Sequence, residues 1–153
     1  MTTTYNVYRN GEKIKTGLTE KTFTDTGLTP NTSYEYQVSA ENSAGESELS
    51  DPITVTTKYS TPTALEVSPR TNNLEVGGTR NLTAVVQPSS AKQTVSWSSS
   101  DDEIATIDNN GKVTAVSAGT ATITVTSTEK SDIKDTATIN VTEPEPDPPE
   151  GES

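Results

Sequence analysis

The chain has 153 residues and a formal net charge of −11, and only 28% of its residues are hydrophobic and 5% aromatic. A chain of this length holds one or two small domains, and its low apolar content predicts a thin core such as that of a β-sandwich. The absence of cysteine and histidine excludes disulfides, thiolate metal sites and the commonest general base, while the acidic balance disfavours nucleic-acid binding.

The first 58 residues read as short strands separated by turn residues. The opening stretch TYNVYRNGEKIKTG places two strands around a tight Asn10-Gly11 turn. Farther on, Tyr34, Tyr36 and Val38 alternate with polar residues, the period of two that marks a half-buried strand. The strands expected in this segment lie near residues 4–9, 12–16, 22–25, 34–42 and 51–57.

The same segment resembles the C-terminal two-thirds of a fibronectin type III domain. The resemblance rests on YNVYRNG, TDTGLTPNTSYEYQVSAENSAGES and PITVTT, in that order. Leu28 followed six residues later by Tyr34 is similar to that family's tyrosine corner, in which the hydroxyl hydrogen-bonds back to the preceding turn. The resemblance implies a structural role for Tyr34 and strands C, C′, E, F and G within residues 1–58, with strands A and B absent.

Without those two strands, one face of the first sheet is expected to lack its cover, so that Tyr5, Val7, Tyr36 and Val38 lie partly uncovered. Three explanations stay open. The chain is cut from a longer protein, two strands are donated by another chain, or Met1 starts a degenerate module. The first is preferred, and on either of the first two the isolated segment 1–58 is expected to be unstable.

Residues 59–63 read as a short linker, because small polar residues and a proline interrupt the strand pattern. A second set of short alternating strands follows over 64–142, separated by Gly, Asn or Asp. These strands are expected near 64–67, 73–76, 79–86, 94–98, 104–108, 112–116, 120–127 and 135–142.

The second set closely resembles a bacterial Ig-like domain of group 2 over residues 62–142. The shared pattern is a strand ending in WSSS, then IATID, an NGKVTA hairpin and AGTATITV, all present in order. Spacing and period predict a β-sandwich, and the resemblance names the family. The core is expected to centre on Trp97, with eight further residues facing inward: Leu82, Ala84, Val95, Ile107, Ile123, Val125, Ile139 and Val141.

The last segment, EPEPDPPEGES at 143–153, alternates acidic residues with proline. Such a composition buries nothing and builds neither helix nor strand. We predict a disordered tail here. The fold class predicted for the whole chain is therefore all-β, with two Ig-like β-sandwich modules in tandem, the first lacking its N-terminal strands, followed by this tail.

Two clusters in the second set of strands contain residues with the chemistry of a site. The acidic stretch with Asp101, Asp102, Glu103 and Asp108 offers oxygens for calcium, but its spacing matches no EF-hand loop, and Asp at strand ends serves turns. The serines at 98–100 have no histidine to act as a base. We therefore expect no catalytic residue, no metal ligand and no cofactor.

Exposed aromatic side chains are the usual platform for carbohydrate. Tyr34, Tyr36 and Trp97 are needed inside the two domains, which leaves Tyr8, Tyr59 and Phe23 as exposed aromatic candidates. Of these, Tyr8 and Tyr59 are the predicted ligand contacts. Tyr8 is expected to pack across its own sheet, and Tyr59 to lie at the junction of the two domains.

Together these features predict a non-enzymatic module. Tandem fibronectin type III and group 2 Ig-like domains resemble appendages of tailed-phage structural proteins, which implies display on the virion surface, contacts with virion subunits and weak multivalent contacts with host cell-surface polysaccharide. No apolar run predicts membrane insertion. The alternative is a structural spacer or adhesion module of a secreted or surface-anchored bacterial protein, located outside the cell.

Overall fold

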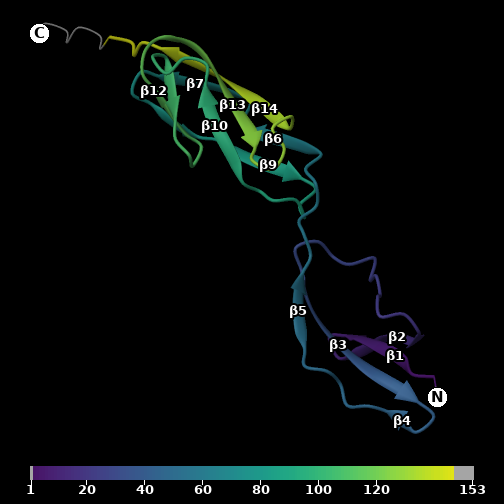
Figure 1. Cartoon of the computed structure of the whole chain (residues 1–153). Helices are drawn as coiled ribbons and strands as arrows, with labels where there is room; N and C mark the ends of the chain where they lie inside the picture. The colour runs from purple at the N-terminus through teal and green to yellow at the C-terminus, as the bar shows by residue number, and fades with distance from the viewer. Residues whose placement is uncertain (1, 147–153) are drawn as a thin grey trace, which may run out of the picture. The chain divides into compact units, whose positions relative to one another are not determined.

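The computed structural model describes residues 2–146, which form two compact units that divide between Ser60 and Thr61 (Figure 1). Every regular element of the described residues is a β-strand, which confirms the all-β prediction. The described residues contain no helix that is long and apolar enough to cross a membrane. Residues 143–146 are exposed and lie outside any strand, and the rest of the predicted tail, 147–153, lies outside the described residues.

Unit 1, residues 2–60, is a five-stranded antiparallel sheet. Its strands run in the order β2-β1-β3-β4, with β5 also paired to β3. The Asn10-Gly11 turn joins β1 to β2 with φ angles of 50° and 80°, the left-handed conformation that a tight hairpin turn requires. The strands are β1 (Thr4–Arg9), β2 (Glu12–Leu18), β3 (Ser33–Asn42), β4 (Gly45–Glu46) and β5 (Ile53–Thr56).

The prediction of a strand near 22–25 is wrong. Residues 19–32 belong to no strand, and among the described residues no hydrogen bond joins the backbone of Thr22, Phe23 or Thr24 to a partner. The β-forming residues are present, but a strand exists only when a neighbouring strand completes its hydrogen-bond ladder. This segment therefore crosses the face of the sheet without becoming part of one.

The face expected to be partly uncovered is so at three of its four named residues. Val38 is 45% exposed, and Tyr5 and Tyr36 are half-buried, but Val7 is only 7% exposed. The expectation for Val7 is therefore wrong. Its strand, β1, is paired on both sides, with β2 and β3, so Val7 lies low in the sheet between two neighbouring strands.

Unit 2, from Thr61 on, holds nine strands in three sheets. A four-stranded sheet has the order β10-β13-β14-β7, a three-stranded sheet the order β11-β12-β8, and β6 pairs with β9. The strands are β6 (Ala64–Ser68), β7 (Thr71–Glu75), β8 (Thr79–Asn81), β9 (Thr83–Gln87), β10 (Val95–Ser99), β11 (Ala105–Ile107), β12 (Lys112–Ala115), β13 (Gly119–Ser127) and β14 (Lys134–Thr142).

The single strand predicted over 79–86 is in fact two strands in different sheets. β8 pairs with β12 and β9 pairs with β6, and the change of sheet takes place at Leu82. Leu82 is 2% exposed, and its N–H donates to the carbonyl oxygen of Gly111 at 2.8 Å. The residue at the break is thus anchored by both its side chain and its backbone.

The hydrophobic core of unit 2 lies between its sheets, and two polar residues of this unit, Asn72 and Ser127, are buried as well. Five of the nine residues predicted to face inward are buried in it: Leu82, Ile123, Val125, Ile139 and Val141. The other four are partly buried and pack against it: Ala84, Val95, Trp97 and Ile107. The prediction that the core centres on Trp97 is therefore wrong. A bulky indole is seldom fully enclosed, and fully buried Val86, Ile123 and Ile139 form the centre.

Candidate functional site

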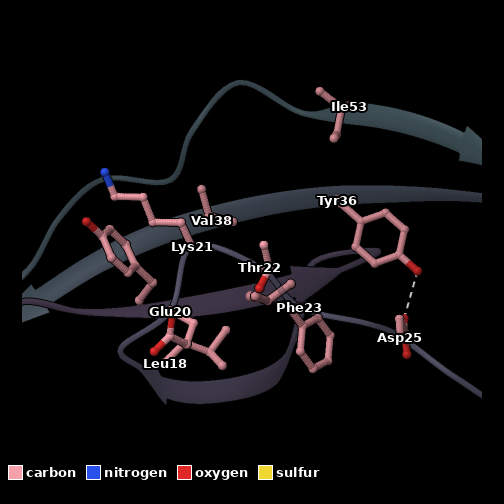
Figure 2. A pocket seen from close by; sticks show the side chains of 11 residues that line it. Leu18, Glu20, Lys21, Thr22, Phe23, Asp25, Tyr36, Val38 and Ile53 are labelled. Carbon is pink, nitrogen blue, oxygen red and sulfur yellow. Dashed lines mark hydrogen bonds between the residues drawn. The ribbon is translucent and has the colours of Figure 1, made fainter.

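Unit 1 carries an apolar groove of about 610 Å³ on one face of its sheet. Figure 2 shows the groove between strands β3 and β5 and the segment that follows β2. Its apolar lining comes from four strands, β1, β2, β3 and β5, and from that segment. These residues are Tyr5, Val7, Leu18, Phe23, Val38 and Ile53. The polar lining residues are Glu20, Lys21, Thr22, Asp25 and Tyr36.

A charged cluster closes one end of this groove. The Tyr36 hydroxyl donates to Asp25 Oδ2 at 2.7 Å (Figure 2), and Arg9 Nη1 donates to the same oxygen at 2.9 Å. The Tyr36 hydrogen bond and the Arg9 guanidinium together hold the pKa of Asp25 below its usual value, despite its partial burial. Asp25 is therefore ionised. Its hydrogen bonds with Tyr36 on β3 and Arg9 on β1 tie the 19–32 segment to the sheet.

Tyr34 lies beside this cluster and holds the next turn. Its hydroxyl accepts a hydrogen bond from the Thr29 N–H at 3.0 Å, the contact that the resemblance to a tyrosine corner implies. This hydrogen bond lowers the pKa of the Tyr34 phenol. The Arg9 guanidinium lies 5.6 Å from the centre of the Tyr34 ring. Both Tyr34 and Arg9 thus fix the 19–32 segment from the side of the sheet.

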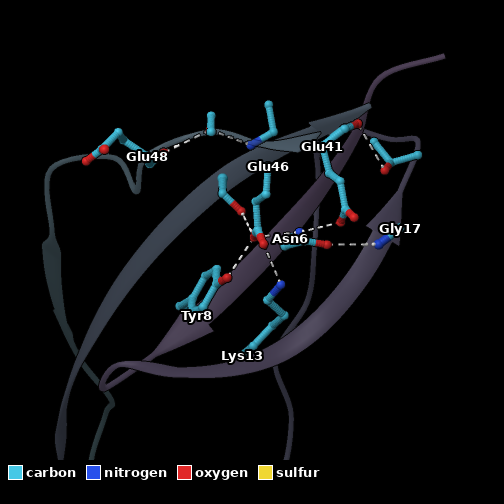
Figure 3. A network of polar contacts seen from close by, with 11 residues as sticks. Asn6, Tyr8, Lys13, Gly17, Glu41, Glu46 and Glu48 are labelled. Atoms are coloured by element: carbon cyan, nitrogen blue, oxygen red, sulfur yellow. Dashed lines mark hydrogen bonds and ion pairs between the residues drawn. The ribbon is translucent and has the colours of Figure 1, made fainter. Parts of the chain in front are cut away.

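The opposite face of the same sheet carries a network of polar contacts, centred on the Glu46 carboxylate (Figure 3). Glu46 accepts hydrogen bonds from Tyr8 at 2.7 Å, Lys13 at 2.9 Å and Asn6 at 2.8 Å. The Ser39 hydroxyl donates to it as well. The donors come from β1, β2 and β3, so one carboxylate on β4 links four strands.

The contacts of this network shift the pKa values of Glu46 and Lys13 in opposite directions. The Ser39, Lys13, Tyr8 and Asn6 donors hold the pKa of Glu46 well below its ordinary value, and Glu46 in turn raises the pKa of Lys13. Asn6 is fully buried, and its Oδ1 accepts the Gly17 N–H at 3.2 Å. The residues meet from positions up to forty apart in the chain, so no local sequence pattern indicated this network.

The two tyrosines predicted as ligand contacts have different surroundings. The Tyr8 hydroxyl is bound to Glu46, and the Lys13 ammonium lies 5.3 Å from the centre of its ring. The Tyr8 hydroxyl and one face of its ring are therefore already occupied by Glu46 and Lys13. Tyr59 is 49% exposed, and within residues 2–146 its side chain takes part in no hydrogen bond or ring contact. The structure does not join the two into one surface.

Two residues of the acidic stretch in unit 2, Asp101 and Asp108, serve their own turns. Asp101 Oδ1 accepts the Glu103 N–H at 2.9 Å, and Asp108 Oδ1 accepts the N–H groups of Asn110 and Lys112 at 2.8 and 2.9 Å. These are the side-chain-to-backbone bonds typical of Asp at loops. In the described part of the chain, no three acidic side chains lie close enough together to hold a metal ion.

The serines beside this cluster are also engaged in the loop. The Ser99 hydroxyl donates to the carbonyl oxygen of Ala105 at 2.6 Å. The Ser100 hydroxyl oxygen accepts the Thr122 N–H at 2.9 Å. Both hydroxyls join the end of β10 to its neighbours, which is a structural task.

The relatives of this chain share only a part of it. It is 51% identical over 55 residues to a lacto-N-biosidase of Bifidobacterium bifidum, a match that covers 36% of this chain and 5% of that enzyme. It is 47% identical over 66 residues to the minor capsid protein of Enterobacteria phage T3, covering 43% of this chain and 15% of the relative. The chain thus spans a small fraction of the length of these curated relatives.

Among solved structures, Drosophila N-cadherin EC1-4 superposes with a TM-score of 0.52 at 15% identity, over 93% of this chain and 41% of that one. This likeness concerns the fold alone. The family models are more specific. Residues 2–56 match the fibronectin type III domain, and residues 62–142 match the bacterial Ig-like domain of group 2. Neither kind of domain is catalytic. The chain therefore belongs to the bacterial Ig-like domain (group 2) family and carries a fibronectin type III segment before that domain.

Proposed function

We propose that this chain is a non-catalytic display module on the surface of a phage virion, attached to tail or capsid subunits. The observation that carries the proposal is the stretch shared with a phage minor capsid protein. The order of its two domains supports it, because serial Ig-like units extend a surface without adding chemistry.

The second part of the proposal is weak contact with polysaccharide of the host cell surface. Tyr59 supports it as an exposed aromatic side chain free to stack on a sugar ring. A single exposed ring gives a weak site. Many copies on one particle multiply such weak contacts, because each later contact forms within the same complex.

Electron microscopy of purified virions tests the display role. Gold-labelled antibodies against residues 61–142 are expected to decorate the particle surface at regular positions. Labelling restricted to cell debris, with bare particles, would contradict the proposal.

A glycan array tests the sugar contact separately. The chain is displayed at high copy number on beads, and host-wall polysaccharide is expected to retain the beads, with Tyr59→Ala reducing retention. Tyr59→Phe serves as the matched control, because it keeps the ring and removes only a hydroxyl that makes no hydrogen bond within residues 2–146, and its beads are expected to be retained as those of the parent are. Equal retention of the Tyr59→Ala beads would remove Tyr59 from the proposed contact.

A second candidate is a structural spacer or adhesion module of an extracellular bacterial protein. The stretch shared with a bifidobacterial lacto-N-biosidase favours it, because that match covers a small part of a large enzyme. Sequencing the same reading frame and the neighbouring genes distinguishes the two candidate functions. Capsid or tail genes beside it support the display role, and a hydrolase or wall anchor in the same frame supports the spacer.

A further inference from the structure

The sequence contains two Asn-Gly pairs, Asn10-Gly11 in unit 1 and Asn110-Gly111 in unit 2. Glycine has no side chain to shield its backbone nitrogen, so this nitrogen is able to attack the side-chain carbonyl carbon of the asparagine before it. Both pairs lie in turns between two strands, and both asparagines are exposed. The dipeptide and the exposure of its asparagine therefore do not distinguish the two pairs, and their surroundings must.

In unit 2 the nitrogen that would attack is bonded and enclosed. The Gly111 N–H donates to the carbonyl oxygen of Asp108 at 3.1 Å, and the Gly111 carbonyl oxygen accepts the Leu82 N–H at 2.8 Å. Gly111 is buried, and a side chain on it would meet Trp97 at 3.1 Å. The Asn110 N–H donates to Asp108 Oδ1 at 2.8 Å. Moving Gly111 toward the Asn110 side chain therefore requires part of the unit 2 core to open.

In unit 1 the corresponding nitrogen is open to water. Gly11 is exposed, a side chain built on it would meet no atom within 4 Å, and its N–H has no partner within residues 2–146. Two hydrogen bonds hold this turn against β3. The Asn10 N–H donates to the Glu35 carbonyl oxygen at 2.8 Å, and Asn10 Oδ1 accepts the Glu35 N–H at 2.9 Å. Gly11 therefore reaches the Asn10 side chain once these two bonds open.

The hairpin that carries Asn10 lies at the edge of its sheet. β2 is the terminal strand of the order β2-β1-β3-β4, and most of its residues are exposed. Its register with β1 also shifts at two places. An exposed edge hairpin opens more often than a turn packed on a core, because fewer buried contacts are lost on opening. The turn at Asn10 is consequently the one that opens more often.

We propose that Asn10 is a site of spontaneous deamidation in the folded chain, whereas Asn110 is held unreactive by the packing of unit 2. The Gly11 backbone nitrogen gives up its proton and bonds to Asn10 Cγ. The bond from Cγ to the side-chain nitrogen breaks, and that nitrogen leaves with the proton as ammonia. One water molecule then opens the cyclic imide to aspartate or to isoaspartate at position 10. The reaction needs no oxidant and no enzyme.

The isoaspartate product alters the turn itself. In isoaspartate the main chain runs through the former side chain, which adds one carbon atom to the backbone. A two-residue hairpin turn depends on fixed left-handed angles at both of its residues, so the longer backbone does not fit it. The oxygen that accepts the Glu35 N–H is displaced as well. Deamidation at position 10 is therefore expected to release the β1-β2 turn from β3.

Peptide mapping of the full-length chain tests the proposal. The chain is incubated at mildly alkaline pH, and a glutamate-specific protease then releases Asn10 and Asn110 in separate peptides. Mass spectrometry with fragmentation locates the gain of about 1 Da that replacement of an amide by a carboxyl produces. Asn10 is expected to react at least about tenfold faster than Asn110. The reference is the same chain unfolded in urea, in which the two rates are expected to agree within about threefold.

A variant of unit 2 tests why Asn110 is unreactive. Trp97→Ala removes the ring that lies beside Gly111 and is expected to raise the rate at Asn110 at least about tenfold, with the rate at Asn10 unchanged. A variant that fails to fold would expose Asn110 fully and raise its rate as well. Val116→Ala is the matched control, since Val116 is 45% exposed, and both of its rates are expected to equal those of the parent.

Two results would overturn the proposal. The first is a folded chain in which Asn10 reacts less than about tenfold faster than Asn110, whether because Asn10 is slow or because Asn110 is fast. The second is a rate at Asn110 that stays at the parental value in Trp97→Ala, which would show that the packing of unit 2 does not restrain it.

Discussion

The indole ring of Trp97 lies beside Gly111, in the space that a side chain on Gly111 would enter. A methyl group built on Gly111 would lie 3.1 Å from Trp97 Cζ2 and 2.6 Å from the carbonyl oxygen of Leu82. Gly111 also has a φ of 81°, in the left-handed region that favours glycine. The tight hairpin between β11 and β12 and the edge of the core are therefore fixed by the same residue.

The first prediction concerns Gly111→Ala, with Gly77→Ala as its matched control. Gly77 has a similar φ of 85° but no atom near its missing side chain, so its substitution is expected to cost about 1–2 kcal/mol for the left-handed backbone. Gly111→Ala is expected to cost a further 1–3 kcal/mol, roughly, because the methyl group also displaces its neighbours.

Thermal unfolding followed by tryptophan fluorescence checks this difference. Trp97 is the only tryptophan of the chain, so the signal reports unit 2 alone. Each kcal/mol is expected to lower the midpoint by about 4–8 °C for a domain of this size. Equal midpoints for the two variants would show that the contact with Trp97 and Leu82 carries no energetic weight.

The second prediction is that Trp97→Ala destabilises unit 2 by about 3 kcal/mol, the lower end of the range for tryptophan, because its ring is only partly buried. Circular dichroism replaces fluorescence as the probe, since the variant has no tryptophan. Val116→Ala is the control, because Val116 is 45% exposed and its loss is expected to change stability by less than about 0.5 kcal/mol. A midpoint within a few degrees of the parent would contradict the role of Trp97.

The third prediction is that Tyr34→Phe lowers the stability of unit 1 by about 1 kcal/mol, because the Thr29 N–H loses its acceptor. Tyr59→Phe removes a hydroxyl that makes no described hydrogen bond, so the free energy of unfolding is expected to stay within about 0.5 kcal/mol of the parent. Amide exchange of residues in β1 and β3 measures unit 1 without interference from unit 2. If both variants behave alike, the Tyr34 hydroxyl contributes nothing to the fold.

The fourth prediction is that unit 1 loses stability in acid. The pKa values of Glu46 and Asp25 are lower in the folded protein than in the unfolded chain, so the unfolded chain binds protons first as the pH falls. The stabilisation is fully present above the ordinary carboxyl pKa of about 4. It is lost progressively as the pH falls from there toward the depressed folded values.

Melting of unit 1 between pH 6 and pH 2.5 checks this slope. Glu46→Gln is expected to flatten it, because the variant keeps hydrogen-bonding atoms and has no proton to take up. Glu48→Gln is the matched control, since the Glu48 side chain makes no hydrogen bond in the described part of the chain, and its profile is expected to follow the parent. Identical profiles for all three proteins would assign the acid sensitivity to other groups.

The sequence predicted most of the strands because their signal is local. The alternation in β3 and β13 and the Asn10-Gly11 turn are each readable within ten residues. The strand near 22–25 failed because its residues favour a strand while its ladder partner is missing. Local preference cannot report whether a neighbouring strand exists.

The contacts at the candidate site were not predictable for a related reason. Asn6, Lys13 and Glu46 meet only after β1, β2 and β4 assemble around β3, and Glu46 lies on a two-residue strand that no periodicity reveals. The groove likewise exists because no element of the described residues packs over Val38 and Ile53. A sequence records which residues are apolar, but burial depends on the elements packed over them.

The parallel pairing of β7 with β14 has a mechanical consequence. The chain enters β7 at Thr71 and leaves β14 at Thr142, and the two strands run side by side in the same direction over five residue pairs. A pull that reaches unit 2 through these two points slides one strand lengthwise along the other. The ladder bonds are then loaded together instead of opening one after another from an end. A pull applied across β7 and β14 therefore meets more resistance than one that peels a single strand from the edge of the sheet.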